Sequence, residues 1–243
     1  MSKFTIRTLN ETYIIQSPLL VRLKKKSPLT VLCELVAMQK EELIRELIEG
    51  GWLKTKPVIE AFEKVPREDF VPQEYGKYAY ANEPLPIGHG QTISQPLTAA
   101  VMTELLEAKK GHKILEVGTG SGYQAAILSE IVGPRGKIIT TEIIPELFEF
   151  AKMNLAGYKN VNVLNIDGSL GCEKESPYDR IIVTASAPSV PPPLVEQLKE
   201  GGRLVIPVED RMMLIEKNGK IKETFVGYYA FVPLRGEHGK LNK

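Results

Sequence analysis

Apolar side chains recur at two different periods along the chain. Between Gln39 and Gly51 they lie three and four positions apart, which predicts an amphipathic helix that ends at a glycine pair. Residues 56–65 repeat this helical spacing, with Pro57 near the start and Pro66 after the end. The first part of the chain is therefore expected to contain two helices.

From Leu97 onward, short apolar runs typical of buried strands alternate with amphipathic runs typical of helices. The predicted strands are residues 112–117, 137–143, 160–167, 178–186 and 203–208, and the predicted helices are residues 97–108, 123–133, 145–158 and 191–202. This alternation predicts a parallel sheet with helices on both faces. Asn218-Gly219 separates two further alternating runs and predicts a hairpin, so that antiparallel strands close the chain. The expected fold class is α/β, a doubly wound and mostly parallel sheet of the Rossmann-like kind.

Two segments do not follow these patterns. Residues 66–96 are rich in Pro, Gly and Tyr, and a long irregular stretch of this kind is usually functional or disordered. Its four aromatic side chains argue against disorder, so we predict a packed loop that covers a site. Residues 1–37 carry a charge of +4, against −3 for the remainder, with a weakly alternating run typical of a strand pair and a solvated basic run at 22–28.

Composition limits the function further. The chain has 243 residues and a net charge of +1, which gives no general attraction to nucleic acid or membrane. Two cysteines and three histidines do not predict a disulfide framework or a metal site. No apolar run is long enough for a membrane span, so we expect a cytoplasmic protein. The predicted organisation is an extension (1–37), a helical and loop cap (38–96) and a core (97–243).

A glycine-rich loop follows the first predicted strand of the core. Val117 ends this strand, and Gly118, Gly120 and Gly122 follow at alternate positions. Glycine lets the backbone approach a ligand closely, and the next helix directs its free N–H groups at the same place. The loop predicts a nucleotide-like ligand, although tight turns after strands also use glycine.

Three acids make the ligand more specific. Glu116, Glu142 and Asp167 fall at the ends of three neighbouring parallel strands, where doubly wound sheets bind ligands and hold ribose hydroxyls. Each acid alone is typical of a solvated strand end, but together with the glycine loop they favour binding. Glu116 would repel the pyrophosphate of NAD, whereas it would attract the cationic sulfonium and ammonium of S-adenosylmethionine. The predicted cofactor is S-adenosylmethionine.

At this point the sequence resembles the protein-L-isoaspartate (D-aspartate) O-methyltransferases. The resemblance covers roughly residues 38–236 and is most specific at GQTIS, which precedes the glycine loop. It rests on six stretches in order: residues 65–72, 84–96, 115–124, 177–191, 198–208 and 231–237. It implies methylation of the abnormal carboxylate of isoaspartyl residues, after which the ester collapses to a succinimide and gives normal aspartate another chance to form.

The resemblance also implies the site. Ser94 corresponds to the active-site serine, in a loop that covers the cofactor and shapes the substrate groove. A carboxylate is ionised at pH 7, so it needs alignment rather than a base, and one hydroxyl of Ser94 or Thr92 can hold one of its oxygens. From its position alone Ser94 could instead cap the following helix. The implied cofactor-binding residues are Gln91, Thr92, Ile93, Glu116, Gly118, Thr119, Gly120, Gly122, Glu142, Ile143, Asp167 and Gly168.

Two other functions stay open. A methyltransferase acting on RNA or a small molecule would share the cofactor half, but residues 184–191 contain no NPPY-like tetrapeptide and no aromatic to stack a base. An NAD-binding oxidoreductase or nucleotide-binding module is disfavoured by Glu116 and by the hairpin ending. The expected partners are isoaspartyl-containing proteins and peptides, without nucleic acid or membrane, and the expected state is a monomer.

Overall fold

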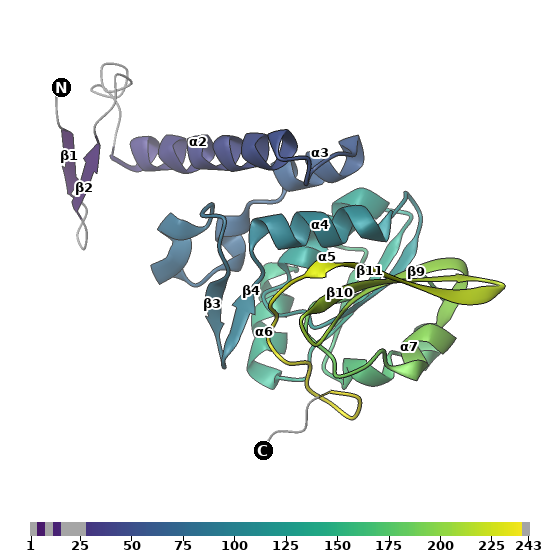
Figure 1. Cartoon of the computed structure of the whole chain (residues 1–243). Coiled ribbons are helices and arrows are strands. Elements are labelled where there is room, and N and C mark those ends of the chain that lie inside the picture. Colours follow the sequence, from purple (N-terminus) through teal and green to yellow (C-terminus); the bar gives the residue numbers. More distant parts are fainter. Residues whose placement is uncertain (1–3, 8–11, 16–27, 240–243) are drawn as a thin grey trace.

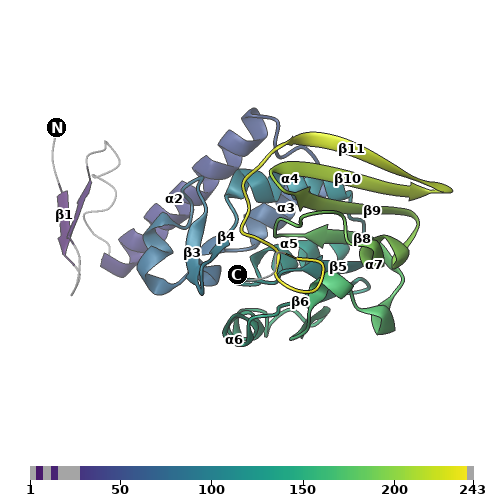
Figure 2. The ribbon, with the colours of Figure 1, turned by 60° about the horizontal axis from the view of Figure 1, so that its bottom comes forward.

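The protein is built on a seven-stranded sheet. A computed structural model describes residues 4–7, 12–15 and 28–239 (Figure 1). The strands of the sheet are β5 (Lys113–Val117), β6 (Lys137–Thr141), β7 (Val161–Leu164), β8 (Tyr178–Val183), β9 (Leu198–Val208), β10 (Arg211–Asn218) and β11 (Lys220–Tyr228). Their order is β11-β10-β9-β8-β5-β6-β7, and Figure 2 shows it from β11 to β6. The neighbours from β9 to β7 pair in parallel and β9, β10 and β11 pair antiparallel, which confirms the predicted fold class.

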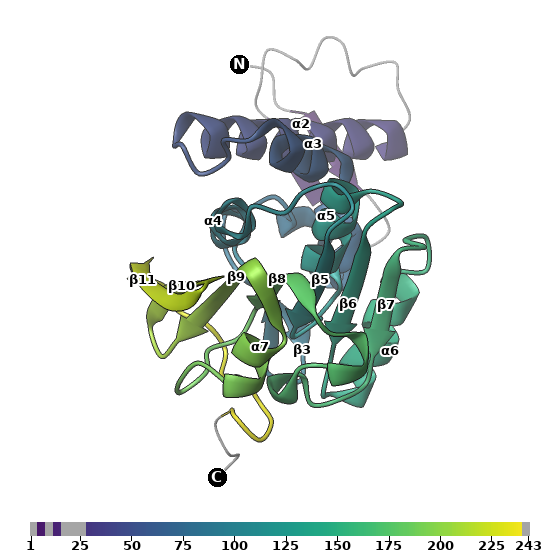
Figure 3. The same cartoon turned by 90° about the vertical axis from the view of Figure 1, so that its right-hand side faces the viewer.

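Helices cover both faces of this sheet. They are α2 (Pro28–Glu49), α3 (Lys56–Lys64), α4 (Pro96–Leu106), α5 (Tyr123–Val132), α6 (Pro145–Asn154) and α7 (Pro192–Glu196). Buried side chains form two clusters, and neighbouring strand residues such as Ile114 and Leu115 belong to different clusters. The first cluster contains residues of α2 to α6, whereas the second contains Leu194 of α7. Figure 3 shows α4 and α5 on one side of the sheet and α7 on the other.

The predicted packed loop at residues 66–96 has more regular structure than expected. It contains two 3-10 helices, η1 (Arg67–Phe70) and η2 (Gln73–Tyr78), and a hairpin of β3 (Leu85–Gly88) and β4 (Gln91–Ile93). Leu85 and Ile87 are buried and alternate with exposed neighbours, as expected for a strand with one face on the core. Residues 88–90 all adopt positive φ and make the turn between the two strands.

Several predicted helices have different limits in the structure; the helix predicted over residues 145–158, for example, ends at Asn154. The helix expected after Met38 begins at Pro28, a residue favoured in the first turn. The helix expected to reach Gly202 stops at Glu196, and β9 begins at Leu198, which pairs with Tyr178. Before the first helix, β1 (Phe4–Arg7) and β2 (Thr12–Ile15) form the predicted strand pair. Most of the basic run, residues 22–27, lies outside the described residues.

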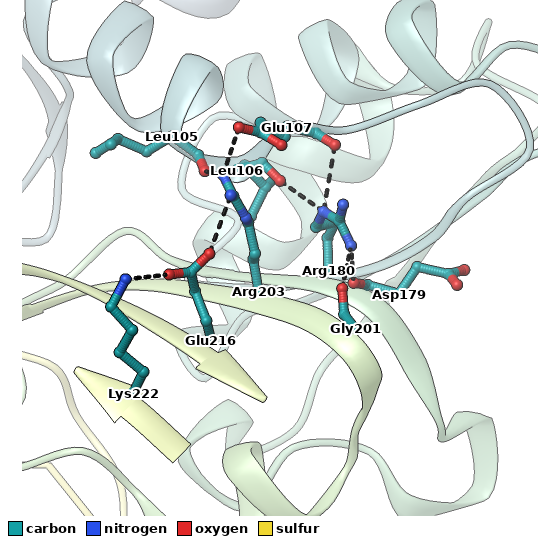
Figure 4. Close-up of polar contacts among 9 residues, drawn as sticks. All are labelled: Leu105, Leu106, Glu107, Asp179, Arg180, Gly201, Arg203, Glu216 and Lys222. Atoms are coloured by element: carbon teal, nitrogen blue, oxygen red, sulfur yellow. Dashed lines mark hydrogen bonds and ion pairs between the residues drawn. The ribbon is translucent and has the colours of Figure 1, made fainter. Parts of the chain in front are cut away.

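Helix α4 links the predicted site to the sheet. Its first residue, Pro96, follows Ser94 by two positions, and its last carbonyl groups meet two arginines of the sheet (Figure 4). Arg180 Nε donates to the carbonyl of Leu106 at 2.6 Å, and Arg203 Nη1 donates to that of Leu105 at 3.3 Å. Cations at a helix C-terminus satisfy free carbonyls and complement the helix dipole. The end of α4 distant from Ser94 is therefore anchored to the sheet.

Candidate active site

The glycine loop connects β5 to α5, as the sequence predicts. Gly118, Gly120 and Gly122 adopt φ values of +93°, +55° and +93°, a region that side chains disfavour. A Cβ atom at Gly118 would lie 2.5 Å from the hydroxyl oxygen of Thr184. Gly122 is the N-cap residue of α5. The loop therefore leaves open backbone at the carboxyl end of the sheet, where a ligand can approach closely.

Glu142 follows β6 and is bound to the same loop. Its carboxylate accepts hydrogen bonds from the backbone N–H of Gly120 at 2.9 Å and of Ile144 at 3.0 Å. Only 6% of the residue is exposed, and this burial raises the pKa of its carboxyl group. The two N–H donors fix the carboxylate at the edge of the cavity that Gly118 and Gly120 line.

Glu116 is the most unusual acid of the site. It is fully buried, and neither carboxylate oxygen has a hydrogen-bond partner in the described part of the chain. Burial raises the pKa of its carboxyl group to about 8; the nearby hydroxyl of Thr140 lowers this pKa, and the charge of Glu142 adds to the rise. The hydroxyl of Thr140, its neighbour on β6, is hydrogen-bonded to that of Thr119 at 2.6 Å. An unpaired buried carboxylate is costly, and a cationic ligand is the natural partner for it.

The glycine loop and these acids line two adjoining cavities. The cavities share Thr92, Gly118, Gly120 and Thr184, and together they form what we call the cofactor cavity. Of the predicted cofactor residues, those that line it are Gln91, Thr92, Ile93, Glu116, Gly118, Thr119, Gly120, Glu142, Ile143 and Gly168. Gly122 and Asp167 are the two predicted residues that do not line it. Thr184 and residues 232–235 also line the cavity but are not among the predicted cofactor-binding residues. Both lie in stretches that carry the family resemblance.

Asp167 holds the C-terminal segment. Its carboxylate accepts hydrogen bonds from the backbone N–H of Ser169 at 2.9 Å and of Glu237 at 2.7 Å. Upstream, the N–H of Leu234 donates to the carbonyl of Ser186 at 2.8 Å. These contacts fix the segment that forms one wall of the cofactor cavity.

A third cavity adjoins the cofactor cavity at Thr92 and Thr184. It has a volume of about 340 Å³, and we call it the acceptor cavity. Its polar side chains are the hydroxyls of Thr92, Ser94, Thr98 and Thr184, the amide of Gln95 and the phenols of Tyr228 and Tyr229. No Asp, Glu, Lys or Arg of the described chain lines it. Ser94 also lines the part of the cofactor cavity that contains Glu116, so it stands at the junction.

The structure argues against Ser94 as a helix cap. The first turn of α4 is capped by the side chain of Asn82, which accepts a hydrogen bond from the N–H of Leu97 at 3.0 Å. The N-cap position itself is Gln95, whose side chain makes no capping bond. The hydroxyl of Ser94 is therefore not needed to start this helix.

The described residues contain neither a metal-binding cluster of side chains nor a helix that could span a membrane. In residues 4–7, 12–15 and 28–239, no group of three or more His, Cys, Asp or Glu side chains could hold a metal ion. Over the same ranges, none of the helices has the length and apolar content of a membrane span.

Comparison with known proteins identifies the family. The sequence pattern described as protein-L-isoaspartate(D-aspartate) O-methyltransferase matches residues 38–239. The chain is 53% identical over 209 residues to the protein-L-isoaspartate O-methyltransferase of Methanopyrus kandleri, covering 82% of this chain and 92% of that relative. It is 50% identical over 208 residues to protein-L-isoaspartate O-methyltransferase 2 of Archaeoglobus fulgidus, covering 83% and 95%. The crystal structure of a Plasmodium falciparum protein-L-isoaspartate O-methyltransferase in complex with S-adenosyl-L-homocysteine superposes with a TM-score of 0.72 at 26% identity, covering 80% of this chain and 97% of that one. The chain therefore belongs to the protein-L-isoaspartate (D-aspartate) O-methyltransferase family.

Proposed function

We propose that this enzyme transfers a methyl group from S-adenosylmethionine to the free carboxylate of L-isoaspartyl residues in damaged proteins. The observation that carries the proposal is the junction at Ser94, where a cavity with buried acids meets a cavity lined by hydroxyls, with no charged side chain among the described residues that line it. A cationic methyl donor suits the first cavity, and a carboxylate that must stay nucleophilic suits the second.

The residues of the cofactor cavity fit S-adenosylmethionine. Glu116 is a buried carboxylate without a donor, and Glu142 is held at the rim by two N–H groups. In the proposal Glu142 accepts hydrogen bonds from the ribose hydroxyls, and Glu116 stabilises the positive end of the cofactor. The bare backbone at Gly118 gives the cofactor room beside the strand end. When bound, the cofactor would supply an electrophilic methyl group on a positively charged sulfur, which would keep the electron pair of the broken methyl–sulfur bond and leave as a neutral thioether.

Ser94 aligns the acceptor in this proposal. Its hydroxyl donates a hydrogen bond to one oxygen of the isoaspartyl carboxylate, and the other oxygen stays free to attack the methyl group. Thr92, which borders both cavities, is the second hydroxyl in reach of this position. Because the carboxylate is already ionised near pH 7, no side chain has to remove a proton. Tyr229 and Phe231 line the acceptor cavity and help exclude water.

Labelled methyl transfer tests the proposal. The enzyme is incubated with labelled S-adenosylmethionine and either an isoaspartyl peptide or the same peptide with normal aspartate. We expect label to enter only the isoaspartyl peptide, as an ester that is lost through succinimide formation. Equal labelling of both peptides, or labelling of neither, contradicts the proposal. Titration calorimetry with S-adenosylmethionine and with NAD tests the cofactor separately, and tight binding of NAD alone favours an oxidoreductase.

We also propose that the enzyme acts as a cytoplasmic monomer on polypeptides and not on nucleic acid. A net charge of +1 supports the last point, because binding to a phosphate backbone depends on many cations. Sedimentation of the purified enzyme, alone and with RNA, tests the monomer and the acceptor class together.

A further inference from the structure

Arg67 belongs to the VPREDFVP stretch, to which the proposed mechanism gives no role. Its side chain is fully buried, with an exposed fraction of 0%. Its guanidinium has no Asp or Glu within ion-pair distance in the described part of the chain. Burying a cation without a counter-ion is costly, so this arginine needs an explanation.

The partners of Arg67 are backbone carbonyls at both ends of one loop. Its Nε donates to the carbonyl of Ala79 at 2.8 Å, and Nη2 donates to that of Glu83 at 3.2 Å. Its Nη1 donates to the carbonyl of Ser94 itself at 2.8 Å. The segment between these carbonyls includes the β3–β4 hairpin with Thr92. A single guanidinium therefore closes the base of the loop that carries the proposed acceptor-binding hydroxyls.

The same guanidinium also touches the cofactor side of the site. Its carbon Cζ lies 5.3 Å from the ring centroid of Tyr123, which is within the range of a cation–π interaction. Tyr123 is the first residue of α5 and follows Gly122 directly. Phe70, from the same stretch as Arg67, packs against this ring with centroids 5.7 Å apart. Arg67 therefore contacts both halves of the site at once.

We propose that Arg67 is a positioning residue for methyl transfer, because its guanidinium fixes where Ser94 stands relative to the glycine loop. This inference rests on the role proposed above for Ser94. The three nitrogens of its rigid, planar guanidinium reach three separate carbonyls, whereas the donors of a lysine all lie on one nitrogen and a methionine has none. In the chemical step a displacement of about 1 Å can cost on the order of a hundredfold in rate.

Arg180 provides a matched control at the opposite end of α4. It is also buried and also donates to backbone carbonyls, those of Leu106 and Glu107 at 2.6 Å and 3.2 Å (Figure 4). Like Arg67 it lines none of the three cavities of the site, but unlike Arg67 it donates to no carbonyl of the loop that ends at Ser94. A purely structural role for Arg67 therefore predicts that Arg67 and Arg180 variants behave alike.

The experiment compares Arg67→Lys, Arg67→Met, Arg180→Met and the unchanged enzyme. For each we measure the thermal midpoint, the dissociation constant for S-adenosylmethionine, and kcat and KM for an isoaspartyl peptide, at a temperature where every variant is folded. For both Arg67 variants we expect kcat to fall by about ten- to a hundredfold, with cofactor affinity within about threefold of the unchanged enzyme. For Arg180→Met we expect a lower thermal midpoint with kcat within about twofold.

Three results would overturn the inference. One is an Arg67→Lys or Arg67→Met enzyme that is less stable but turns over as fast as the unchanged enzyme. Another is a kcat of Arg180→Met that falls as far as that of the Arg67 variants. The third is failure of both Arg67 variants to fold, because Arg67 would then be required for the fold as a whole. An unchanged enzyme that does not methylate the isoaspartyl peptide instead contradicts the proposed function itself.

Discussion

The cofactor cavity and the acceptor cavity meet at Thr92 and Thr184, yet they differ sharply in charge. The cofactor cavity is lined by two buried acids, Glu116 and Glu142, and by one arginine, Arg235. The acceptor cavity is lined by hydroxyls, one amide and aromatic rings, with no acidic or basic side chain among the described residues that line it. The two proposed substrates differ in the opposite way, because the cofactor is a cation and the acceptor is an anion.

This difference indicates which kind of group binds each of the two ligands. The cation receives counter-charges from the protein, whereas the anion receives only neutral donors. A lysine or arginine beside the acceptor would bind the carboxylate more tightly, but it would also withdraw charge from the attacking oxygen. In the proposed mechanism the attraction for the acceptor comes from the positive sulfur of the bound cofactor. Four substitutions or conditions test this contrast.

The largest effect is expected from removing the carboxylate of Glu142, which two backbone N–H groups hold at the edge of the cofactor cavity. Glu142→Ala deletes the proposed partner of the ribose hydroxyls and frees the N–H groups of Gly120 and Ile144. Loss of two charge-assisted hydrogen bonds should cost about 2–4 kcal/mol, which weakens binding by roughly 30- to 900-fold. Calorimetry with S-adenosylmethionine measures the change. Glu146→Ala, an exposed acid on the first turn of α6, is the control and should bind normally.

Ser94→Ala tests the acceptor side of the same contrast. One hydrogen bond to a charged oxygen contributes about 1.5–3 kcal/mol, so turnover should fall by about ten- to a hundredfold while cofactor affinity stays nearly unchanged. Ser94→Thr keeps a hydroxyl and should retain more activity. The thermal midpoint should not change, whereas Asn82→Ala should lose about 1 kcal/mol of stability because Asn82 caps α4. A joint loss of stability and cofactor binding in Ser94→Ala would show that the residue is structural.

The pH dependence of cofactor binding tests whether Glu116, the buried acid without a hydrogen-bond partner among the described residues, interacts with the cofactor. Burial raises the pKa of Glu116 to about 8, so near neutral pH the free enzyme holds its carboxyl group mainly protonated. A cationic cofactor favours the ionised form, so binding should release a proton and affinity should rise with pH until it levels off above about 8. At pH 7 we expect affinity about tenfold weaker than at pH 9.

Glu116→Gln separates this effect from titration of the cofactor's own amino group. In this variant the part of the pH dependence that belongs to Glu116 should disappear. Calorimetry in two buffers with different ionisation enthalpies counts the released protons directly. The same proton release in Glu116→Gln and in the unchanged enzyme would contradict the assignment. The raised pKa also means that the free energy of unfolding contributed by this group falls as pH rises from about 4.5 to 8, because the folded state holds the proton longer.

The two cavities also differ in how far the sequence predicts them. The cofactor cavity depends on a loop with glycines at alternate positions and on acids at strand ends, and these are local signals. They predict that Glu116 and Glu142 lie beside the glycine loop, where the structure has them. Asp167 obeys the same spacing, yet its carboxylate holds the N–H of Glu237, seventy residues further along the chain. Spacing predicts where a strand ends, but not which distant segment the side chain meets.

The acceptor cavity depends mainly on contacts between distant segments. Its walls come from the segment between Pro84 and Thr98, the residue after β8, and the end of β11 with the chain beyond it, so no local pattern encloses it. Family resemblance supplied Ser94, but nothing near Ser94 in the sequence indicates Arg67 or Asn82, which hold its loop and the next helix. The fold class was predictable because strand and helix periods are local. The end of α7 at Glu196 was not, because β9 begins two residues later, where Leu198 pairs with Tyr178 of β8.

The smallest effect is expected from adding a negative charge to the acceptor cavity. Gln95→Glu changes one amide of this cavity to a carboxylate of nearly the same shape. Two negative charges several ångströms apart in water-accessible surroundings repel by roughly 0.5–1 kcal/mol, so KM for an isoaspartyl peptide should rise about two- to fivefold. Gln95→Met is the control, because it also removes the hydrogen bond to the carbonyl of Asn82 but adds no charge. The difference between the two variants should shrink as salt is added, because salt screens charge repulsion. If Gln95→Glu and Gln95→Met raise KM equally at low salt, the neutrality of the acceptor cavity has no role in binding the carboxylate.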